Sequence, residues 1–389
     1  MADSAITPAR RADSIGRTVD ARRFGDEGLV AVLIWVLPTG WVRDGDARSI
    51  ADLLVDEVGS ADVLLLNKTD LVSEQWSELE RVLSVIKADV ADYAAGATEV
   101  ALMSLASYFD RLDTTASIRD FLYGWSVTSS GASIEEAAMV NCFSSLYDPG
   151  GFTGLVTMIQ YSPSAGWIAL ATAMAQDSDV EVRLNTTVVA LDVSGSRGTV
   201  HPRTGEALNA GHIIVAIPVN TLTDVRITPS LPTPITNVFG SNGGRGTKVI
   251  LRARNVPDRC WAVGNGVGIN QFLWDRERDG VTWLIGFGTR DPAVDFDDHR
   301  HVERALHAYY PEAELVDWQW HDWNSDPYAR GTWLATRPGD VAGLNPDRIP
   351  TGAVMSFATA DLAFESSGWI DGALSSGYRA ARAALGARA

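Results

Sequence analysis

Apolar and polar positions divide the chain into a first part of α/β type and a second part in which helices precede strands. In the first part, the continuous apolar run at residues 29–37 predicts a buried strand, and "ADVLLLNKTDL" predicts a second strand that ends in a loop. Helical spacing marks "ARSIADLLVDEVGSA" and "SEQWSELERVLSVIKA", the latter opened by Ser73. Residues 1–24 carry no such pattern, and we expect a disordered leader there.

From about residue 94 the pattern changes. Helices are predicted first, over "ALMSLASYFDRL", "SIRDFLYGW", "SIEEAAMVNCFSSL" and "GWIALATAMAQ". Strand-rich segments follow: "VEVRLNTTVVALDVS", "GTVHPR", "HIIVAIP", "TKVILRAR" and "TWLIGFGT". A helix over "HVERALHAYY" and a terminal strand, loop and helix complete the chain. The sequence therefore predicts an α/β protein with a leader at 1–24, an α/β fragment at 25–93 and a larger region at 94–389.

Charge and cysteine content limit the partners and the cellular location that we expect for the protein. The net charge of −17 disfavours nucleic acid and anionic membranes as partners, because phosphate would be repelled. Cys142 and Cys260 are the only cysteines, too few for a disulfide scaffold. The first residues lack a signal-peptide core, and the longest apolar run is far shorter than the ~20 residues that span a bilayer. We expect a cytoplasmic protein.

The most informative motif of the first part is "NKTD", directly after an apolar strand. In GTP-binding proteins this motif reads guanine through residues that match Asn67, Lys68 and Asp70. The surrounding sequence, "RSIADLLVDEVGSADVLLLNKTDLVSEQWSELERVL", resembles CobW-type metallochaperone GTPases. None of the three lysines follows a glycine, so the phosphate-binding Gly-Lys motif of such enzymes is missing. The resemblance implies a guanine-binding fragment without hydrolysis.

Several separated pieces of the second part resemble another family, and they occur in its order. They are "SLASYFDRLDTTASIRDFLYGW", "GHIIVAIPVNTLTDVRITPSLP", "GRGTKVILRA", "WQWHDWNSDPYARGTW" and "FATADLAFESSGWIDGALSSGYRAA". Over about residues 98–385 the chain is similar to flavin-containing amine oxidases of the monoamine oxidase-like group. The resemblance implies a two-domain fold with a mixed sheet and a helical substrate domain. It also implies FAD, a small-molecule amine substrate, and hydride transfer from the amine carbon to the flavin with oxygen as acceptor.

The same resemblance assigns three catalytic positions. Lys248 matches a lysine that holds a water near flavin N5, and we expect it to be buried; a surface lysine at a strand edge is the alternative. Trp333 and Trp369 match the two aromatic residues that orient the amine before the flavin. Core packing is the alternative for both tryptophans.

It also assigns the cofactor-binding positions. Small residues at Gly368, Gly372 and Ala373 would let the last helix point its N-terminus at the flavin, and close helix packing is the alternative. Val188 matches a position on the adenine side of the cofactor, and Asp361 matches an acidic residue near the ribityl–phosphate region.

Three features depart from the family pattern. Thr359 and Ala360 replace a glycine and a glutamate next to Asp361. Thr332 stands where members with covalent flavin have cysteine, which implies noncovalent FAD. The sequence contains no Gly-x-Gly-x-x-Gly motif for the FAD pyrophosphate; the nearest run, "GNGVGI", ends in Ile269.

Because that motif is missing, three alternatives to an active oxidase stay open. The chain is an inactive remnant, a guanine-nucleotide-binding or protein-interaction module, or one half of a flavin site that a second polypeptide completes. A separate cluster, "DFDDHRHVERALH", contains carboxylates and imidazoles that could ligate a metal. We instead expect Asp298 to be the N-cap of the following helix, and we assign no metal.

Overall fold

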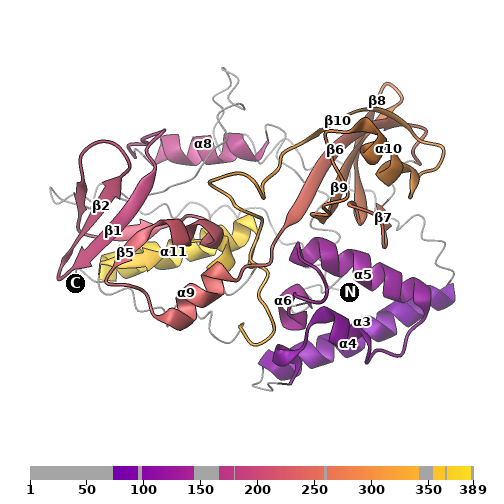
Figure 1. Ribbon diagram of the computed structural model, residues 1–389, viewed down its shortest axis with the longest axis horizontal. Coiled ribbons are helices and arrows are strands. Elements are labelled where there is room, and N and C mark those ends of the chain that lie inside the picture. Colours follow the sequence, from indigo (N-terminus) through magenta and orange to yellow (C-terminus); the bar gives the residue numbers. More distant parts are fainter. Residues whose placement is uncertain are drawn as a thin grey trace, which may run out of the picture.

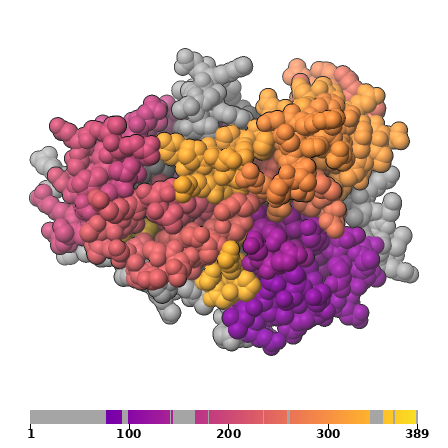
Figure 2. All heavy atoms as spheres, viewed as in Figure 1, coloured from indigo at the N-terminus to yellow at the C-terminus, as the bar shows by residue number. Residues whose placement is uncertain are grey.

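The computed structural model describes residues 73–94, 99–143, 166–178, 180–257, 261–340, 354–363 and 366–386. The predicted leader, the two strands predicted before residue 72 and the guanine-binding residues Asn67, Lys68 and Asp70 lie outside these residues. The described part forms a helical unit, a five-stranded sheet and a mixed α/β region (Figure 1). In Figure 2 the helical unit and the sheet lie against each other at one end of the molecule, and the α/β region forms the other end.

The helical unit is built around a core that α3 shares with later helices. Its elements are α3 (Ser73–Ala94), η2 (Val100–Leu102), α4 (Leu105–Phe109), α5 (Ala116–Ser130) and α6 (Met139–Phe143). On α3, Leu79, Val82 and Ile86 recur at helical spacing and are buried in this core. The buried Tyr108 donates its hydroxyl proton to Asp89 of α3 at 2.6 Å. The last helix of the CobW-like stretch therefore packs with helices of the amine oxidase-like region.

The five-stranded sheet is antiparallel and is covered on one face by a helix. Its strands run in the order β10 (Glu314–Trp320), β6 (Gly246–Arg254), β9 (Val281–Thr289), β8 (Gln271–Arg278) and β7 (Trp261–Val263). Alternate residues of β6, among them Val249 and Leu251, are buried with Val302 and Leu306 of α10 (His299–His307). Because side chains alternate along a strand, Lys248 lies on the opposite face.

The α/β region contains two smaller sheets and most of the remaining helices. The first sheet has the order β3 (Leu208–Ala210), β2 (Arg197–Pro202), β1 (Val188–Ser194) and β5 (Arg226–Thr228). In the second, β11 (Met355–Phe357) pairs in parallel with β4 (Ile213–Val215). The other elements are α8 (Trp167–Asp177), η4 (Val219–Asp224), α9 (Thr233–Gly240), η7 (Ala360–Leu362) and α11 (Ile370–Gly386). Buried residues of β1, β4, β11 and η7 form one core that positions the segment before α11.

The face that α11 buries is made of small side chains. Its buried residues are Gly372, Ser376, Ala380 and Ala384. Large apolar residues on the other side are exposed, namely Ile370, Leu374 and Tyr378. Small residues bring a helix backbone close to its neighbours, so close packing accounts for much of the glycine and alanine content of this helix.

The mixed α/β architecture and most of the predicted elements are confirmed, with two corrections. The helix predicted over "SIEEAAMVNCFSSL" is wrong at its start, because α6 begins only at Met139 and turns precede it. The strand predicted at the start of "VEVRLNTTVVALDVS" is also wrong, since β1 begins at Val188. Within the described residues, no helix is long and apolar enough to cross a membrane.

Candidate active site

Trp333 lies where three separate segments of the chain meet. Its indole Nε1 donates to the carbonyl oxygen of Ser129, near the end of α5, at 2.8 Å. A Cβ atom built on Gly246, the first residue of β6, would lie 3.4 Å from Cη2 of Trp333. A Cβ atom built on Gly368, just before α11, would lie 3.2 Å from the Trp333 Cβ. This one side chain therefore links the helical unit, the sheet and the start of the last helix.

Trp369 follows Gly368 directly and is 43% exposed. Because Gly368 lies beside Trp333, the backbone at Trp369 is close to the segment that carries Trp333, and a joint role of the two tryptophans stays a prediction. Gly368 has φ = +80°, a left-handed conformation that glycine adopts without strain. At Gly372, an added Cβ would lie 2.2 Å from the carbonyl oxygen of Ser366. Gly372 is therefore required by the fold of the protein's own loop, whatever else binds there.

Lys248 lies on the same face of β6 as Gly246, which contacts Trp333. Its Nζ is 5.3 Å from the centre of the Phe287 ring. The expectation of a buried lysine is wrong, since the residue is exposed on the face of the sheet opposite α10. Surrounding protein atoms nevertheless remove enough water to lower the pKa of Lys248, and the negative charge of Asp275 opposes this shift.

The carboxylate of Asp361 is hydrogen-bonded to backbone groups of the protein. Its carboxylate accepts hydrogen bonds from the backbone N–H groups of Leu334 at 2.9 Å and Val219 at 3.4 Å. Burial raises the pKa of Asp361, and these two hydrogen bonds oppose the shift. Asp361 therefore joins η7 and η4 to the segment that carries Trp333, and its contact with a cofactor stays a prediction.

Val188 and Ala373 are the two remaining predicted cofactor positions. Val188 is buried at the start of β1, in the core of the α/β region. Ala373 lies in the first turn of α11, where its N–H donates to the carbonyl oxygen of Trp369 at 3.0 Å. Their roles toward FAD also stay predictions.

Two buried asparagines that the sequence analysis missed hold the Trp333 segment. Asn220 donates from Nδ2 to the carbonyl oxygens of Ala329 at 3.1 Å and Thr332 at 2.9 Å. Oδ1 of Asn242 accepts from the N–H groups of Gly244 and Ala335, each at 2.8 Å. Nδ2 of Asn242 donates to Oδ1 of Asn220, which joins the two amides. Asn220 belongs to no sequence motif, and Asn242 lies in a glycine-rich run that indicates only a turn, so the sequence pattern did not mark them as a pair.

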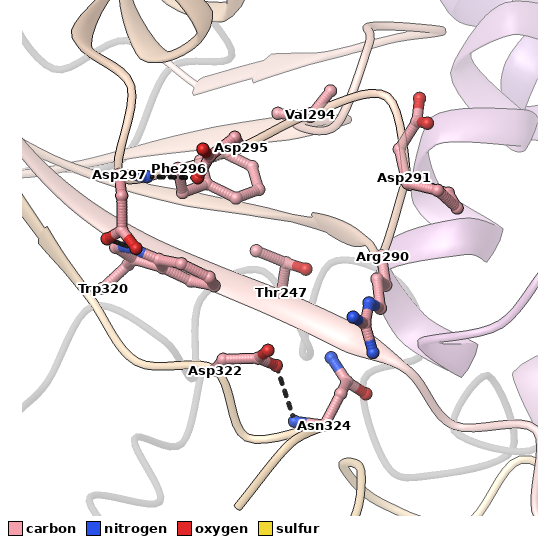
Figure 3. Close-up of a pocket in the computed structure, with 11 residues that line it drawn as sticks. Thr247, Arg290, Asp291, Val294, Asp295, Phe296, Asp297, Trp320, Asp322 and Asn324 are labelled. Atoms are coloured by element: carbon pink, nitrogen blue, oxygen red, sulfur yellow. Dashed lines mark hydrogen bonds between the residues drawn. The ribbon is translucent and has the colours of Figure 1, made fainter.

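A cavity of about 330 Å³ lies beside β6 (Figure 3). Since Thr247 lines it and side chains alternate along a strand, the cavity lies on the face of β6 opposite Lys248. Thr247 lines it, and four aspartates come from the two segments around it. Their carboxylates take part in local contacts: Asp322 Oδ1 accepts from the N–H of Asn324 at 3.0 Å, and Asp297 Oδ1 accepts from Trp320 Nε1 at 2.7 Å. These hydrogen bonds of the aspartates therefore hold the loops around the cavity in place. Trp333 does not line this cavity.

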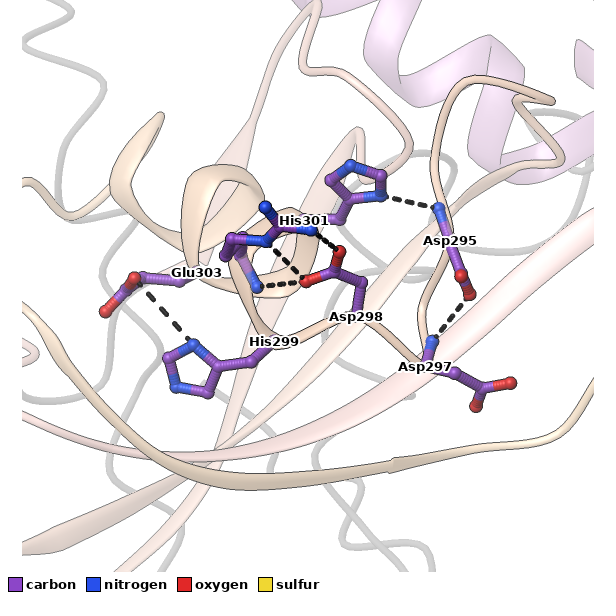
Figure 4. A network of polar contacts seen from close by, with 7 residues as sticks. Asp295, Asp297, Asp298, His299, His301 and Glu303 are labelled. Carbon is purple, nitrogen blue, oxygen red and sulfur yellow. Dashed lines mark hydrogen bonds and ion pairs between the residues drawn. The ribbon is translucent and has the colours of Figure 1, made fainter.

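The acid and histidine cluster at the start of α10 is also explained by local contacts (Figure 4). Asp298 is the N-cap of α10, as predicted, and accepts from the N–H of Arg300 at 2.9 Å. Hydrogen bonds from the Arg300 side chain and backbone hold the pKa of Asp298 well below its usual range. His301 Nδ1 accepts from the N–H of Asp295 at 2.9 Å. Across the part of the chain that the structure describes, no group of three or more His, Cys, Asp or Glu residues could hold a metal ion.

Comparison with solved structures identifies the fold. A putrescine oxidase structure bound to putrescine superposes with a TM-score of 0.67 at 19% identity, over 80% of this chain and 76% of that one. Cyclohexylamine oxidase from Brevibacterium oxydans IH-35A superposes with a TM-score of 0.62 at 18% identity, over 82% of this chain and 76% of that one.

Sequence comparison identifies relatives and the family. Pseudooxynicotine dehydrogenase from Pseudomonas sp is 27% identical, over 71% of this chain and 56% of that protein. (S)-6-Hydroxynicotine oxidase from Paenarthrobacter nicotinovorans is 29% identical, over 72% of this chain and 66% of that protein. The chain thus spans less than two thirds of the length of these two relatives.

Two family models match different parts of the chain. Residues 2–93 match the CobW/HypB/UreG nucleotide-binding domain, which agrees with the resemblance seen in the sequence. Residues 91–385, most of the chain, match the model described as flavin containing amine oxidoreductase. Over this larger part, the chain belongs to the flavin-containing amine oxidoreductase family.

Proposed function

We propose that this chain is an FAD-dependent oxidoreductase of the amine oxidase type that removes hydride from the carbon next to the nitrogen of a small amine. The observation that carries the proposal is the position of Trp333. Its hydrogen bond to Ser129, and its closeness to Gly246 and Gly368, join the segments that carry Lys248 and Trp369. The family resemblance assigns substrate and flavin binding to these segments.

The residues present fit the ring end of a flavin. The N–H groups of Ile370, Asp371 and Gly372, in the first turn of α11, have no acceptor among the described residues. Such groups at a helix N-terminus stabilise negative charge, which a reduced flavin carries on its pyrimidine ring. When bound, the flavin supplies the hydride acceptor. Since Thr332 replaces the cysteine of covalent members, we propose noncovalent binding.

The roles of the side chains follow from their chemistry. Trp333 and Trp369 would orient the amine between two π-faces. Lys248, whose pKa is lowered, would donate a hydrogen bond to a water beside the reacting carbon and the ring. Because two relatives are named for nicotine-type substrates, we propose a nicotine-type amine as substrate, with diamines such as putrescine as the second class to test.

The test begins with the visible absorbance spectrum after incubation with excess FAD and gel filtration. The proposal expects a retained flavin band that an amine bleaches under anaerobic conditions. Lys248→Met should slow this bleaching by on the order of a hundredfold, the scale for removing one positioned hydrogen-bond donor. Lys87→Met, at an exposed position on α3, is the matched control and should leave the rate unchanged.

The opposite outcome is also informative. Loss of all flavin on the column would refute the stand-alone oxidase. If the colourless protein then unfolds at a higher temperature with guanine nucleotide, the nucleotide-binding alternative is favoured.

A further inference from the structure

The segment from Thr332 to Ala335, which carries Trp333, is held at both ends by one pair of buried side chains. At its start, Asn220 binds the carbonyl oxygen of Thr332 at 2.9 Å. At its end, Asn242 binds the N–H of Ala335 at 2.8 Å. The two amides then bind each other. Trp333 is therefore anchored through the backbone on both sides, independently of its own side-chain contacts.

The polarity of this arrangement leaves each amide only one orientation. Nδ2 of Asn220 faces two carbonyl oxygens, so this end must be the donor. Oδ1 of Asn242 faces two N–H groups, so this end must be the acceptor. The remaining ends of the two side chains then match as donor and acceptor. Neither leucine nor an ionised aspartate could make the same set of contacts without leaving a buried group unsatisfied.

Because both asparagines are buried, losing one of these hydrogen bonds would cost stability. Asn220 is 9% exposed and Asn242 is 7% exposed. A buried polar group that loses its partner carries its full desolvation cost, and linked groups depend on one another. The neighbouring Gly331 leaves no room for a side chain, because an added Cβ would lie 2.5 Å from the carbonyl oxygen of Gly244 and 3.0 Å from Nδ2 of Asn220.

We propose that Asn220 and Asn242 form a positioning pair that sets the location of Trp333 relative to Gly368 and the start of α11, and so tunes amine binding. The proposal rests on the proposed function for its kinetic consequence. The hydrogen bonds of the two asparagines given above go to backbone groups and to each other, and not to the side chains of Trp333 or Trp369. Breaking the pair should therefore raise KM for the amine more than it lowers kcat, because the bound amine loses contact with the displaced indole while the reacting groups are intact.

The decisive variant is Asn242→Asp, which turns the pair into a pH switch. When protonated, the new carboxyl accepts from the two N–H groups and donates to Asn220, as the amide does. When ionised, it presents an oxygen to Oδ1 of Asn220 in a buried setting, which raises its pKa above the usual ~3.9. The ratio of variant to wild-type KM should be near one at low pH and should rise roughly tenfold as pH increases.

Two comparisons make the result specific. Asn209→Asp adds the same charge on β3, where the side chain is exposed and its Oδ1 accepts from Thr199 at 3.1 Å. That control should give a ratio of one at every pH. Asn220→Asp removes two donors from backbone carbonyls and should give a larger KM, also reduced by acid. A KM ratio for Asn242→Asp that does not change with pH, whatever its size, overturns the proposal.

Amide hydrogen exchange over the peptide containing Thr332 to Ala335 separates this proposal from the proposed function. If wild-type protein oxidises no amine, the proposed function fails, and exchange alone decides on the pair. Faster exchange of this peptide in Asn242→Asp at high pH, and not at low pH, supports it. Equal exchange in the variant and the wild type at all pH values overturns it.

Discussion

Three glycines around the start of α11 have different surroundings, and alanine substitutions should separate them. At Gly368 the backbone has φ = +80°, and an added Cβ would lie 3.2 Å from Cβ and 3.6 Å from Cγ of Trp333. A left-handed conformation costs an L-residue about 1–2 kcal/mol. We expect Gly368→Ala to lower the free energy of unfolding by about that amount and to displace Trp333.

The other two glycines give opposite expectations. In Gly372→Ala the new Cβ would meet the carbonyl oxygen of Ser366 at 2.2 Å, so the loop or the helix must move. Overpacking costs about 1–3 kcal/mol, and a clash with a backbone oxygen belongs in the upper part of that range, above the ~1 kcal/mol that alanine gains over glycine in a helix. Around Gly377 nothing lies within 4 Å of an added Cβ. Gly377→Ala should therefore stabilise the protein by about 0.5–1 kcal/mol.

Urea denaturation of the three variants, followed by circular dichroism, measures these differences directly. The expected order of midpoints is Gly377→Ala above wild type, with Gly368→Ala and Gly372→Ala below it. Substrate KM adds a second readout, since only Gly368→Ala contacts Trp333 directly. Equal midpoints for Gly368→Ala and Gly377→Ala would refute the view that the left-handed turn beside Trp333 is required.

Further substitutions test the core, the buried acid and the exposed helix face. Ile86→Ala removes a fully buried side chain of α3 and should cost about 2–5 kcal/mol, whereas Val85→Ala at a 42% exposed position should change stability by less than about 0.5 kcal/mol. Equal urea midpoints for this pair would show that α3 does not belong to the core. Asp361 has a raised pKa in the folded state, so the folded protein binds more protons than the unfolded chain above about pH 4. The stability of wild type relative to Asp361→Asn should therefore fall as pH rises from about 4, and a rising difference would contradict the assignment. Leu374→Ser, at a 47% exposed position of α11, should shift the midpoint by no more than about 0.5 kcal/mol, and a larger loss would mean that this face is covered.

Sequence patterns predicted the elements whose side chains alternate clearly between core and solvent. In β9, residues alternate between buried and half-buried along its length, and this strand was predicted. In β8 the second half, "DRER", is exposed, so no alternation marked it. The strand β10 also went unpredicted, because charged and aromatic residues interrupt its apolar pattern.

The wrong helix at residues 133–138 shows tertiary contacts overriding local preference. Its residues favour a helix, but their backbone groups are used elsewhere. The N–H of Ala138 donates to the carbonyl oxygen of Thr336 at 2.9 Å, and the carbonyl oxygen of Ile134 accepts from the N–H of Ala106 at 2.8 Å. Helix propensity is a weak preference, and such long-range hydrogen bonds outweigh it.

The residues of the candidate site likewise divide into those that the sequence predicted and those that it did not. Trp333, Trp369 and Lys248 are predicted from the family resemblance, which marks their positions, and their roles stay predictions. Asn220 and Asn242 were not found, because their partners are mostly backbone groups brought close only by folding. A side chain that acts on the backbone of a distant segment leaves no spacing rule in the sequence, so a structure is needed to reveal it.

The helix α3 resembles one family in sequence but packs against the part of the chain that belongs to another family. Most of α3 lies in the part that matches the CobW nucleotide-binding model, yet Leu79 and Ile86 pack in the core shared with α5 and α6. The sequence of an amphipathic helix indicates which face is buried, but it does not indicate which other part of the protein covers that face. Three polar contacts fix the choice here: Tyr108 to Asp89, and both Thr114 and Thr115 to Glu78. The contacts of α3 therefore determine where this helix packs, and the residues it contacts belong to the amine oxidoreductase part of the chain.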